Sequence, residues 1–289
     1  MKLENPYAAG GTWYRGNLHA HTTESDGRRE PQAVIDDYAA RGYDFLAISD
    51  HDLLTDPDRF DSAGMLLIRG NEVTARGPHL LHVNADRVVE PRPDRQQVLF
   101  DIAENAESLA ILAHPNWHRT YDHYPQELLE TLEGHVGIEI YNGVIERLPG
   151  SAYATDRWDR LLGKGHRVWG FAHDDSHLDT DVELGWNVVF ARSRTPQDLL
   201  DAMRRGSFYA STGVRFQSIA ASGSTIRATA TEEVRWTILT DFGVRRAHCV
   251  GTELVWELPE DSRATYVRVE AHGPKGTAAW SQPFFVTAE

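Results

Sequence analysis

The segment Gly16-Asn17-Leu18-His19-Ala20-His21-Thr22 opens the first strand of the chain, and Ser25-Asp26-Gly27 follows at once. Residues i and i+2 of a strand lie on the same face, so the imidazoles of His19 and His21 point toward one spot. Two histidines, with the carboxylate of Asp26 five residues farther on, are donors typical of a divalent-metal site. A lone pair of histidines is more often structural, so the hypothesis depends on whether this chemistry recurs.

The same donors do recur at the ends of further short apolar runs. They occur in Ile48-Ser49-Asp50-His51-Asp52, Gly70-Asn71-Glu72, Ala113-His114-Pro115, Gly137-Ile138-Glu139 and His173-Asp174-Asp175-Ser176-His177, and His79 and His82 flank another apolar stretch. In a parallel barrel or sheet these strand ends gather on one face, where the connecting loops build active sites. The repetition favours a metal site over chance.

Composition excludes several classes of protein. Of the 289 residues, 41% are hydrophobic and 25% are charged, which suits one large folded domain with or without a small appendage. The net charge of −14 repels polyanions, so we expect no long nucleic acid as the main partner. Residues 1–6 lack the apolar run of a signal peptide, and no segment reaches membrane-spanning length, so we expect a cytoplasmic protein without a membrane partner. The single cysteine, Cys249, excludes an intrachain disulfide, and we expect it to be a small buried core residue.

Helix and strand patterns alternate over the first three quarters of the chain. Helical patterns over residues 30–42, 94–108, 126–132 and 154–163 are each followed by a short apolar strand, which predicts an α/β fold with a mostly parallel sheet or barrel. Thr195 and Pro196 are typical of a helix start. Short β-rich stretches fill residues 214–289, where we expect a small antiparallel β-sandwich. This accessory domain could cap the barrel, shape the pocket or stabilise a homo-oligomer, or serve only as support.

As an ordered set, the motifs resemble the PHP (polymerase and histidinol phosphatase) superfamily of metal-dependent hydrolases. The resemblance covers roughly residues 13–213 and rests on His19-x-His21 with Ser25-Asp26-Gly27, Ser49-Asp50-His51, Gly70-Asn71-Glu72, Ala113-His114-Pro115 and Asp175-Ser176-His177. The later block Gly206-Ser207-Phe208-Tyr209-Ala210-Ser211-Thr212-Gly213 resembles the branch of carbaryl-hydrolase-like metallohydrolases. The superfamily implies a distorted (β/α)7 barrel, which we expect over residues 1–213, ahead of the sandwich over residues 214–289.

The resemblance also implies a centre of two or three divalent ions. Histidine and carboxylate donors without cysteine suit zinc, manganese or iron at hydrolytic sites. On the matching positions the first ion falls to His19, His21, Glu72 and Asp175. Glu72 bridges to a second ion, completed by His114 and either His79 or His82, and a third ion falls to Asp26, His51 and His177. Neighbouring ions would share a water, lower its pKa and present hydroxide to an electrophile.

Several assignments stay open at this stage. His79 and His82 would point to opposite faces of one strand, so we expect one ligand, with a slight preference for His82. Asp175 fits the Asp-x-His pattern, which leaves Asp174 to orient a ligand. His173 and Asp175 are the candidate catalytic residues, with His173 either a proton donor to the leaving group or a structural residue.

A second set of residues carries weaker signals. We expect Glu139 to support a ligand, and His118 and His123 to be solvated or to cap a helix. Three arginines are candidate anion clamps, because a guanidinium binds phosphate in a bidentate fork. Nothing in the sequence selects among them, and an ordinary surface residue is the better expectation for each: Arg15, Arg147 and Arg215.

The function expected first is that of a metal-dependent phosphoesterase acting on a small phosphate ester or nucleotide. The alternative is a hydrolase of carboxylic or carbamate esters on the same metal centre, because both reactions use the same hydroxide. A non-enzymatic, metal-stabilised binding module is a third hypothesis. No Gly-x-Ser-x-Gly segment is present, so a serine hydrolase is not supported.

Overall fold

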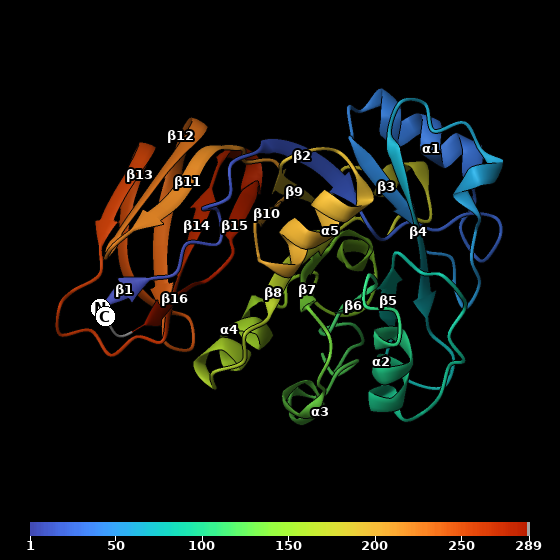
Figure 1. The fold of residues 1–289 in the computed structure, drawn as a ribbon, viewed down its shortest axis with the longest axis horizontal. Coiled ribbons are helices and arrows are strands. Elements are labelled where there is room, and N and C mark those ends of the chain that lie inside the picture. The colour runs from blue at the N-terminus through green and yellow to red at the C-terminus, as the bar shows by residue number, and fades with distance from the viewer. Residues whose placement is uncertain (288–289) are drawn as a thin grey trace.

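The computed structural model describes residues 1–287, whose strands all join in a single 16-stranded sheet (Figure 1). The α-helices are α1 (Pro31–Ala40), α2 (Arg95–Ala103), α3 (Gln126–Thr131), α4 (Thr155–Gly163) and α5 (Pro196–Arg204). The strands of the first part are β1 (Lys2–Leu3), β2 (Thr12–Asn17), β3 (Phe45–Ile48), β4 (Leu66–Val73), β5 (Leu80–Val83), β6 (Leu109–Leu112), β7 (Gly137–Asn142), β8 (Trp169–His173), β9 (Trp186–Ala191) and β10 (Phe208–Ser211). The remaining strands are β11 (Phe216–Ser222), β12 (Thr225–Thr240), β13 (Val244–Glu257), β14 (Tyr266–His272), β15 (Ala278–Ser281) and β16 (Phe284–Thr287).

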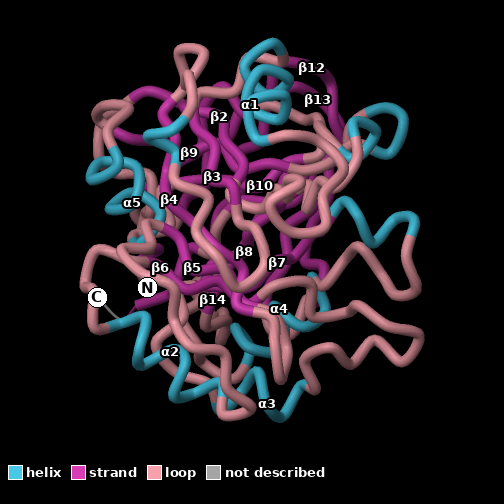
Figure 2. The backbone as a smooth tube through the Cα atoms, turned by 90° about the vertical axis from the view of Figure 1, so that its right-hand side faces the viewer, coloured by secondary structure: helices cyan, strands magenta, loops and turns pink. Residues whose placement is uncertain are grey.

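The predicted alternation of helix and strand is confirmed for the first part of the chain. The pairs β2–β3, β3–β4, β6–β7 and β7–β8 are parallel, and the helices lie around these strands (Figure 2). By contrast, β5 runs antiparallel to β4 and β6, and β9 runs antiparallel to β2. A turn too short for a helical crossover joins β4 to β5, which forces the antiparallel pairing. The fold is therefore a mixed α/β fold with a large sheet, and the closed (β/α)7 barrel stays a prediction.

Polar side chains complete the edge of β8 that has no strand beside it. Asn187 accepts from the backbone N–H of Ala172 at 3.2 Å and donates to its carbonyl at 2.8 Å. Gln282 does the same for Gly170, at 2.9 and 2.7 Å. Buried backbone groups need such partners. The amides of Asn187 in β9 and of Gln282 between β15 and β16 therefore hold β8 in place.

Strands β11–β16 are antiparallel, as the sequence predicted for the C-terminal part, and they form the side of the molecule without α-helices in Figure 1. They continue into the first part because β10 pairs with both β9 and β15. Across the same junction, Arg268 of β14 binds both carboxylate oxygens of Asp159 in α4, at 2.7 and 2.6 Å. The division into domains at residue 213 stays a prediction.

Two further observations concern the surface. Cys249 is exposed, so the expectation of a buried core residue is wrong. The reason is that Cys249 lies in β13, which pairs only with β12 among the described strands and forms an edge of the sheet. Within residues 1–287, no helix combines the length and the apolar character needed to cross a membrane.

Candidate metal centre

The expected metal donors meet where the strands of the first part end. His19 and His21 follow β2, Glu72 is the next-to-last residue of β4, and His114 comes two residues after β6. Asp175 comes two residues after β8, and its backbone N–H donates to the carbonyl of His19. Side chains far apart in the sequence thus converge because the ends of neighbouring strands share one edge of the sheet.

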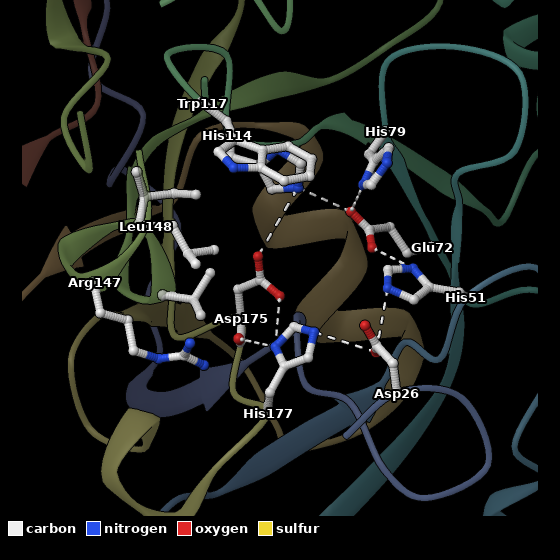
Figure 3. Close-up of a pocket in the computed structure, with 12 residues that line it drawn as sticks. Asp26, His51, Glu72, His79, His114, Trp117, Arg147, Leu148, Asp175 and His177 are labelled. Atoms are coloured by element: carbon white, nitrogen blue, oxygen red, sulfur yellow. Dashed lines mark hydrogen bonds and ion pairs between the residues drawn. The ribbon is translucent and has the colours of Figure 1, made fainter. Parts of the chain in front are cut away.

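Glu72 is the centre of this cluster, because each of its oxygens faces a different set of imidazoles (Figure 3). Its Oε1 lies 3.1 Å from both His79 Nδ1 and His114 Nε2. Its Oε2 lies 2.9 Å from His51 Nδ1 and 3.6 Å from His21 Nε2. A carboxylate in this arrangement can serve two ions, one on each oxygen.

Asp175 and Asp26 extend the cluster on the other side. Asp175 Oδ1 lies 3.2 Å from His19 Nε2 and 3.0 Å from His21 Nε2. Asp26 Oδ1 lies 3.3 Å from His51 Nε2 and 3.2 Å from His177 Nε2. The three ligand sets implied by the PHP resemblance are therefore each brought together as groups of neighbouring donors, with the second set formed through His79.

The structure separates the two candidates for the second site. His79 precedes β5 and lines the pocket beside Glu72, whereas His82 lies within β5 with its Nε2 3.1 Å from the hydroxyl of Ser108. The sequence preference for His82 is therefore not supported by its position. The reason is that β5 pairs with β4 through a hairpin, which turns the loop residue His79, and not the strand residue, toward Glu72.

The donors fit divalent ions on two structural grounds. Buried atoms without a hydrogen-bond partner among the described residues include His19 Nε2, His21 Nε2 and Glu72 Oε2, and unsatisfied atoms of this kind are rare in proteins. In addition, His114 and Asp175 adopt φ angles of 32° and 53°, which are strained for residues other than glycine. Strain of this kind, on the order of 1–3 kcal/mol per residue, clusters at functional sites.

The two buried carboxylates and the imidazole of His21 are held in the forms that bind metals. Burial by itself would raise the pKa of the Glu72 carboxyl, but the charges of His79 and His19 hold that pKa well below its usual range. Burial opposes ionisation of Asp175 too, and His19 and His21 hold its pKa well below the usual range. Burial lowers the pKa of His21. Ionised carboxylates and a neutral imidazole are the forms that bind metals.

A second layer of side chains orients the donors. Glu139 Oε1 accepts from His19 Nδ1 at 2.6 Å and from His173 Nδ1 at 2.8 Å. Its Oε2 accepts from the N–H of His114 and from Asn142 Nδ2, both at 2.7 Å. Glu139 thus directs His19 Nε2 toward the cluster, the supporting role expected for it. His173 is fully buried and does not line the pocket, so its position favours the structural alternative over proton donation.

Asp174 does not touch a metal donor. Its carboxylate accepts from the hydroxyl of Tyr38 and from the backbone N–H groups of Glu183, Leu184 and Gly185. It therefore anchors the loop after β8, which carries Asp175, and orients a ligand only through the backbone.

A pocket of about 260 Å³ opens beside the donors. Trp117, Val144, Ile145 and Leu148 contribute apolar side chains to its lining. Arg147 and Leu148 lie on the side of the pocket away from Glu72 and Asp26 (Figure 3). Arg147 is held by Asp181 through Nε at 2.9 Å and Nη2 at 2.7 Å, which leaves Nη1 without a partner among the described residues. A fixed guanidinium with a free N–H group beside a metal centre suits an anionic substrate.

The other two candidate arginines lie elsewhere. Arg15 packs against the rings of Tyr43 and Trp186 and pairs with Glu183 at 2.9 Å. Arg215 lines a separate hollow at the junction with the C-terminal strands. Of the three arginines, the structure therefore brings only Arg147 to the pocket.

Sequence reasoning missed two residues of the site. Asn142 donates to Asp175 Oδ2 at 3.1 Å as well as to Glu139, and its place at the end of β7 was the available signal. His123, expected to be solvated or capping, is buried, and its ring lies 4.8 Å from the rings of both His79 and His114. Burial and the neighbouring histidines lower the pKa of His123 to about 2, so its imidazole is neutral. No motif marks His123.

Comparison with known proteins agrees with this architecture. No family model matches the chain. A two-domain protein from Bacteroides vulgatus, containing a predicted PHP-like metal-dependent phosphoesterase, superimposes with a TM-score of 0.58 at 17% identity, covering 100% of this chain and 98% of that one. A 5′-3′ exoribonuclease from Haemophilus influenzae is 34% identical over 79 residues, which cover 25% of this chain and 29% of the length of that relative.

The chain therefore has the fold of a PHP-like protein, and the resemblance seen in the sequence is confirmed at the level of the fold. The similarity extends over the C-terminal strands as well, since the B. vulgatus protein is matched along almost its whole length. The carbaryl-hydrolase branch stays a prediction.

Proposed function

We propose that the protein is a metal-dependent phosphoesterase that hydrolyses a small phosphate ester or a nucleotide. The observation that carries the proposal is the pairing of two features in one pocket. Imidazoles surround both oxygens of Glu72, and the free Nη1 of Arg147 lies across the same pocket. The first suits divalent ions and the second suits an anionic group.

Three sets of residues would hold the ions. His19, His21, Glu72 and Asp175 form the first set, Glu72, His79 and His114 the second, and Asp26, His51 and His177 the third. Bound divalent ions supply Lewis acidity and an activated water for attack on the ester. The donor chemistry fits zinc, manganese or iron, and the choice among them is not fixed by these residues.

The remaining residues would bind and orient the substrate. Arg147, kept in place by Asp181, donates to a phosphate oxygen, and its charge favours the phosphate over a neutral ester. The apolar wall of Trp117 and Leu148 excludes water and packs against the organic part of the substrate. Glu139 keeps the tautomer of His19 fixed, and His173 supports Glu139. Among the described residues no serine or cysteine lines this pocket, so we propose that water, and not a hydroxyl or thiol side chain, is the nucleophile.

Two other functions are alternatives. The partial match to an exoribonuclease favours removal of a terminal nucleotide from an RNA, although the net charge of −14 disfavours contact with a long polyanion. Hydrolysis of a carboxylic or carbamate ester on the same centre is disfavoured by Arg147, whose charge has no partner in a neutral substrate.

Metal analysis followed by a substrate panel tests the proposal. The protein should bind at least two divalent ions per chain and hydrolyse aryl phosphates or nucleotides, with no turnover of aryl carbamates. His19→Ala and Asp175→Ala should lower the metal content and abolish turnover, because each removes a donor from the first set. Turnover of carbamates alone, or wild-type metal content in both variants, would contradict the proposal. A folded, metal-loaded protein without activity on any ester would indicate a binding module.

A further inference from the structure

His79 differs from the other donors in its place in the fold. It lies in the connection between β4 and β5, whereas the others lie in or directly after strands that pair in parallel, or in the turns that these strands lead into. Its side chain is 19% exposed, close to the values for His51 and His177 and well above the 1% for Glu72, which it faces. A loop residue keeps more conformational freedom than a strand residue, so contacts of its own must fix its position.

Two consecutive residues from a different loop hold both backbone polar groups of His79. The N–H of His79 donates to Nε2 of His123 at 2.8 Å, and the hydroxyl of Tyr124 donates to the carbonyl of His79 at 2.7 Å. The N–H of Ala113 donates to the same carbonyl at 3.1 Å. The backbone of His79 is therefore fixed on both sides while its ring faces Glu72.

The hydrogen bonds of His123 also decide what this histidine can do. Its Nε2 accepts a hydrogen bond from the backbone N–H of His79, so Nδ1 carries the ring proton, and Nδ1 lies 3.4 Å from Nε2 of His118. The donor atoms of His79, His114 and His123 lie within 4.8 Å of one another, which by distance alone would suggest a three-histidine metal site. Because neither nitrogen of His123 offers a free lone pair, this ring is a support and not a ligand.

We propose that His123 and Tyr124 are positioning residues that hold His79 against Glu72 and thereby set the affinity of the second ion. The inference rests on the proposed metal centre and adds to it two residues that contact neither substrate nor ion. It also links the ion to the pocket wall, because the same loop carries Trp117, whose ring lies 5.4 Å from that of His79. Supporting residues of this kind change metal affinity by roughly 10–100-fold in other proteins.

Binding of Zn²⁺ by the full-length chain tests the proposal without any activity assay. After removal of metals with a chelator, the stoichiometry and affinity for Zn²⁺ are measured by competition with a chromophoric chelator. His123→Ala should lower the affinity for the Zn²⁺ ion held by Glu72, His79 and His114 by roughly 10–100-fold. Binding of the other ions should not change. His123→Gln, whose amide oxygen can accept from the N–H of His79, should restore most of the affinity. His118→Ala, which leaves the Nε2 contact intact, is the matched control and should bind as the wild type does.

Tyr124→Phe keeps the test decisive if His123→Ala fails to fold, because it removes only a hydroxyl group. It should lower the affinity for the same ion. Circular dichroism and the melting temperature of the apo-protein report on the fold. Wild-type Zn²⁺ affinity in both His123→Ala and Tyr124→Phe would overturn the proposal. A wild-type chain that binds no Zn²⁺ would instead contradict the metal centre itself, so the two failures can be told apart.

Discussion

Glu72 shows how much a single residue can decide at this site. Its two oxygens face different imidazoles, and its ionisation is maintained by His79 and His19 against the cost of burial. A buried carboxylate without partners would take up a proton. The proposed centre therefore depends on pairing each carboxylate with several histidines, and its individual donors can be tested one at a time.

Replacement of the two competing histidines should give unequal results. We expect His79→Ala to remove one ion per chain and most of the activity, because His79 Nδ1 lies 3.1 Å from Glu72 Oε1. His82→Ala should change the metal content little, since His82 contacts Ser108 outside the pocket. Elemental analysis of the two purified variants checks this. Loss of metal from the His82 variant alone would instead identify His82 as the ligand of the second ion.

Arg147 should matter for substrate binding and not for the metals. We expect Arg147→Met to lower kcat/KM for a phosphate monoester by roughly 10–100-fold, the effect of losing one hydrogen bond to a charged group. Metal content should stay at the wild-type value. Arg215→Met is the matched control, because Arg215 lines a different hollow, and it should leave kcat/KM unchanged. Equal losses in both variants would indicate a general effect of charge.

At the scale of secondary structure, most of the proposed metal donors lie in the loops after the strands, and the strands fix where these loops begin. β8 is the clearest case, because His173, Asp175 and His177 all lie at its end or just beyond it. The edge of β8 opposite β7 is completed by the side chains of Asn187 and Gln282 in place of a strand. Side-chain amides thus contribute to the placement of the metal donors.

Loss of one of these amides should destabilise the fold measurably. Gln282→Ala leaves the buried N–H and carbonyl of Gly170 without partners, and we expect it to lower the free energy of unfolding by roughly 2–5 kcal/mol. Urea denaturation of the metal-free protein measures this. Gln217→Ala, at an exposed position in β11, should change the free energy by no more than about 0.5 kcal/mol. A Gln282 variant as stable as this control would show that water can form hydrogen bonds with the backbone N–H and carbonyl of Gly170.

At the scale of the whole molecule, a buried ion network joins the two parts. Arg268 is 1% exposed and contacts Asp159 of α4 and Glu270 of β14 at 2.6 and 2.5 Å. Removing one partner from such a network leaves an uncompensated buried charge, which is costly. The junction between the part that carries the proposed metal centre and the C-terminal strands should therefore weaken in acid.

The pH dependence of stability follows from Glu270. Burial opposes its ionisation, but Arg268 and His272 lower the pKa of Glu270 to about 2. A depressed pKa contributes stability above the unfolded value of about 4.3, and this contribution disappears as the pH falls toward 2. We expect Glu270→Gln to cost on the order of 2–3 kcal/mol at pH 7 and progressively less between pH 5 and pH 2.

Urea denaturation of wild type and variant across this pH range tests the expectation. Glu233→Gln, at an exposed position, controls for the loss of one negative charge, and its free energy of unfolding should equal that of the wild type at each pH. If the difference in the free energy of unfolding between wild type and Glu270→Gln stays constant from pH 7 to pH 3, the pKa of Glu270 does not differ between the folded and unfolded states.

Local patterns determined the elements and the donors. Helix starts such as Thr195, which accepts from the N–H of Asp198, and the strand ends that carry His51 and His114 depend on neighbouring residues, so they could be predicted from the sequence. The ordered motifs also predicted a PHP-like fold. These features are encoded within short windows, where backbone preferences and side-chain periodicity act.

Only the tertiary structure decided which donors meet and what supports them. The antiparallel hairpin of β4 and β5 turns His79 toward Glu72, and no spacing rule could separate His79 from His82 without that pairing. His123 lies in a loop and Arg147 at the end of a short 3-10 helix, and the positions of both depend on distant contacts, with His79 and with Asp181. Burial and hydrogen bonding between residues far apart in the chain are properties of the packed molecule. For this reason the sequence could predict the kind of site, whereas only the tertiary structure decided which residues form it.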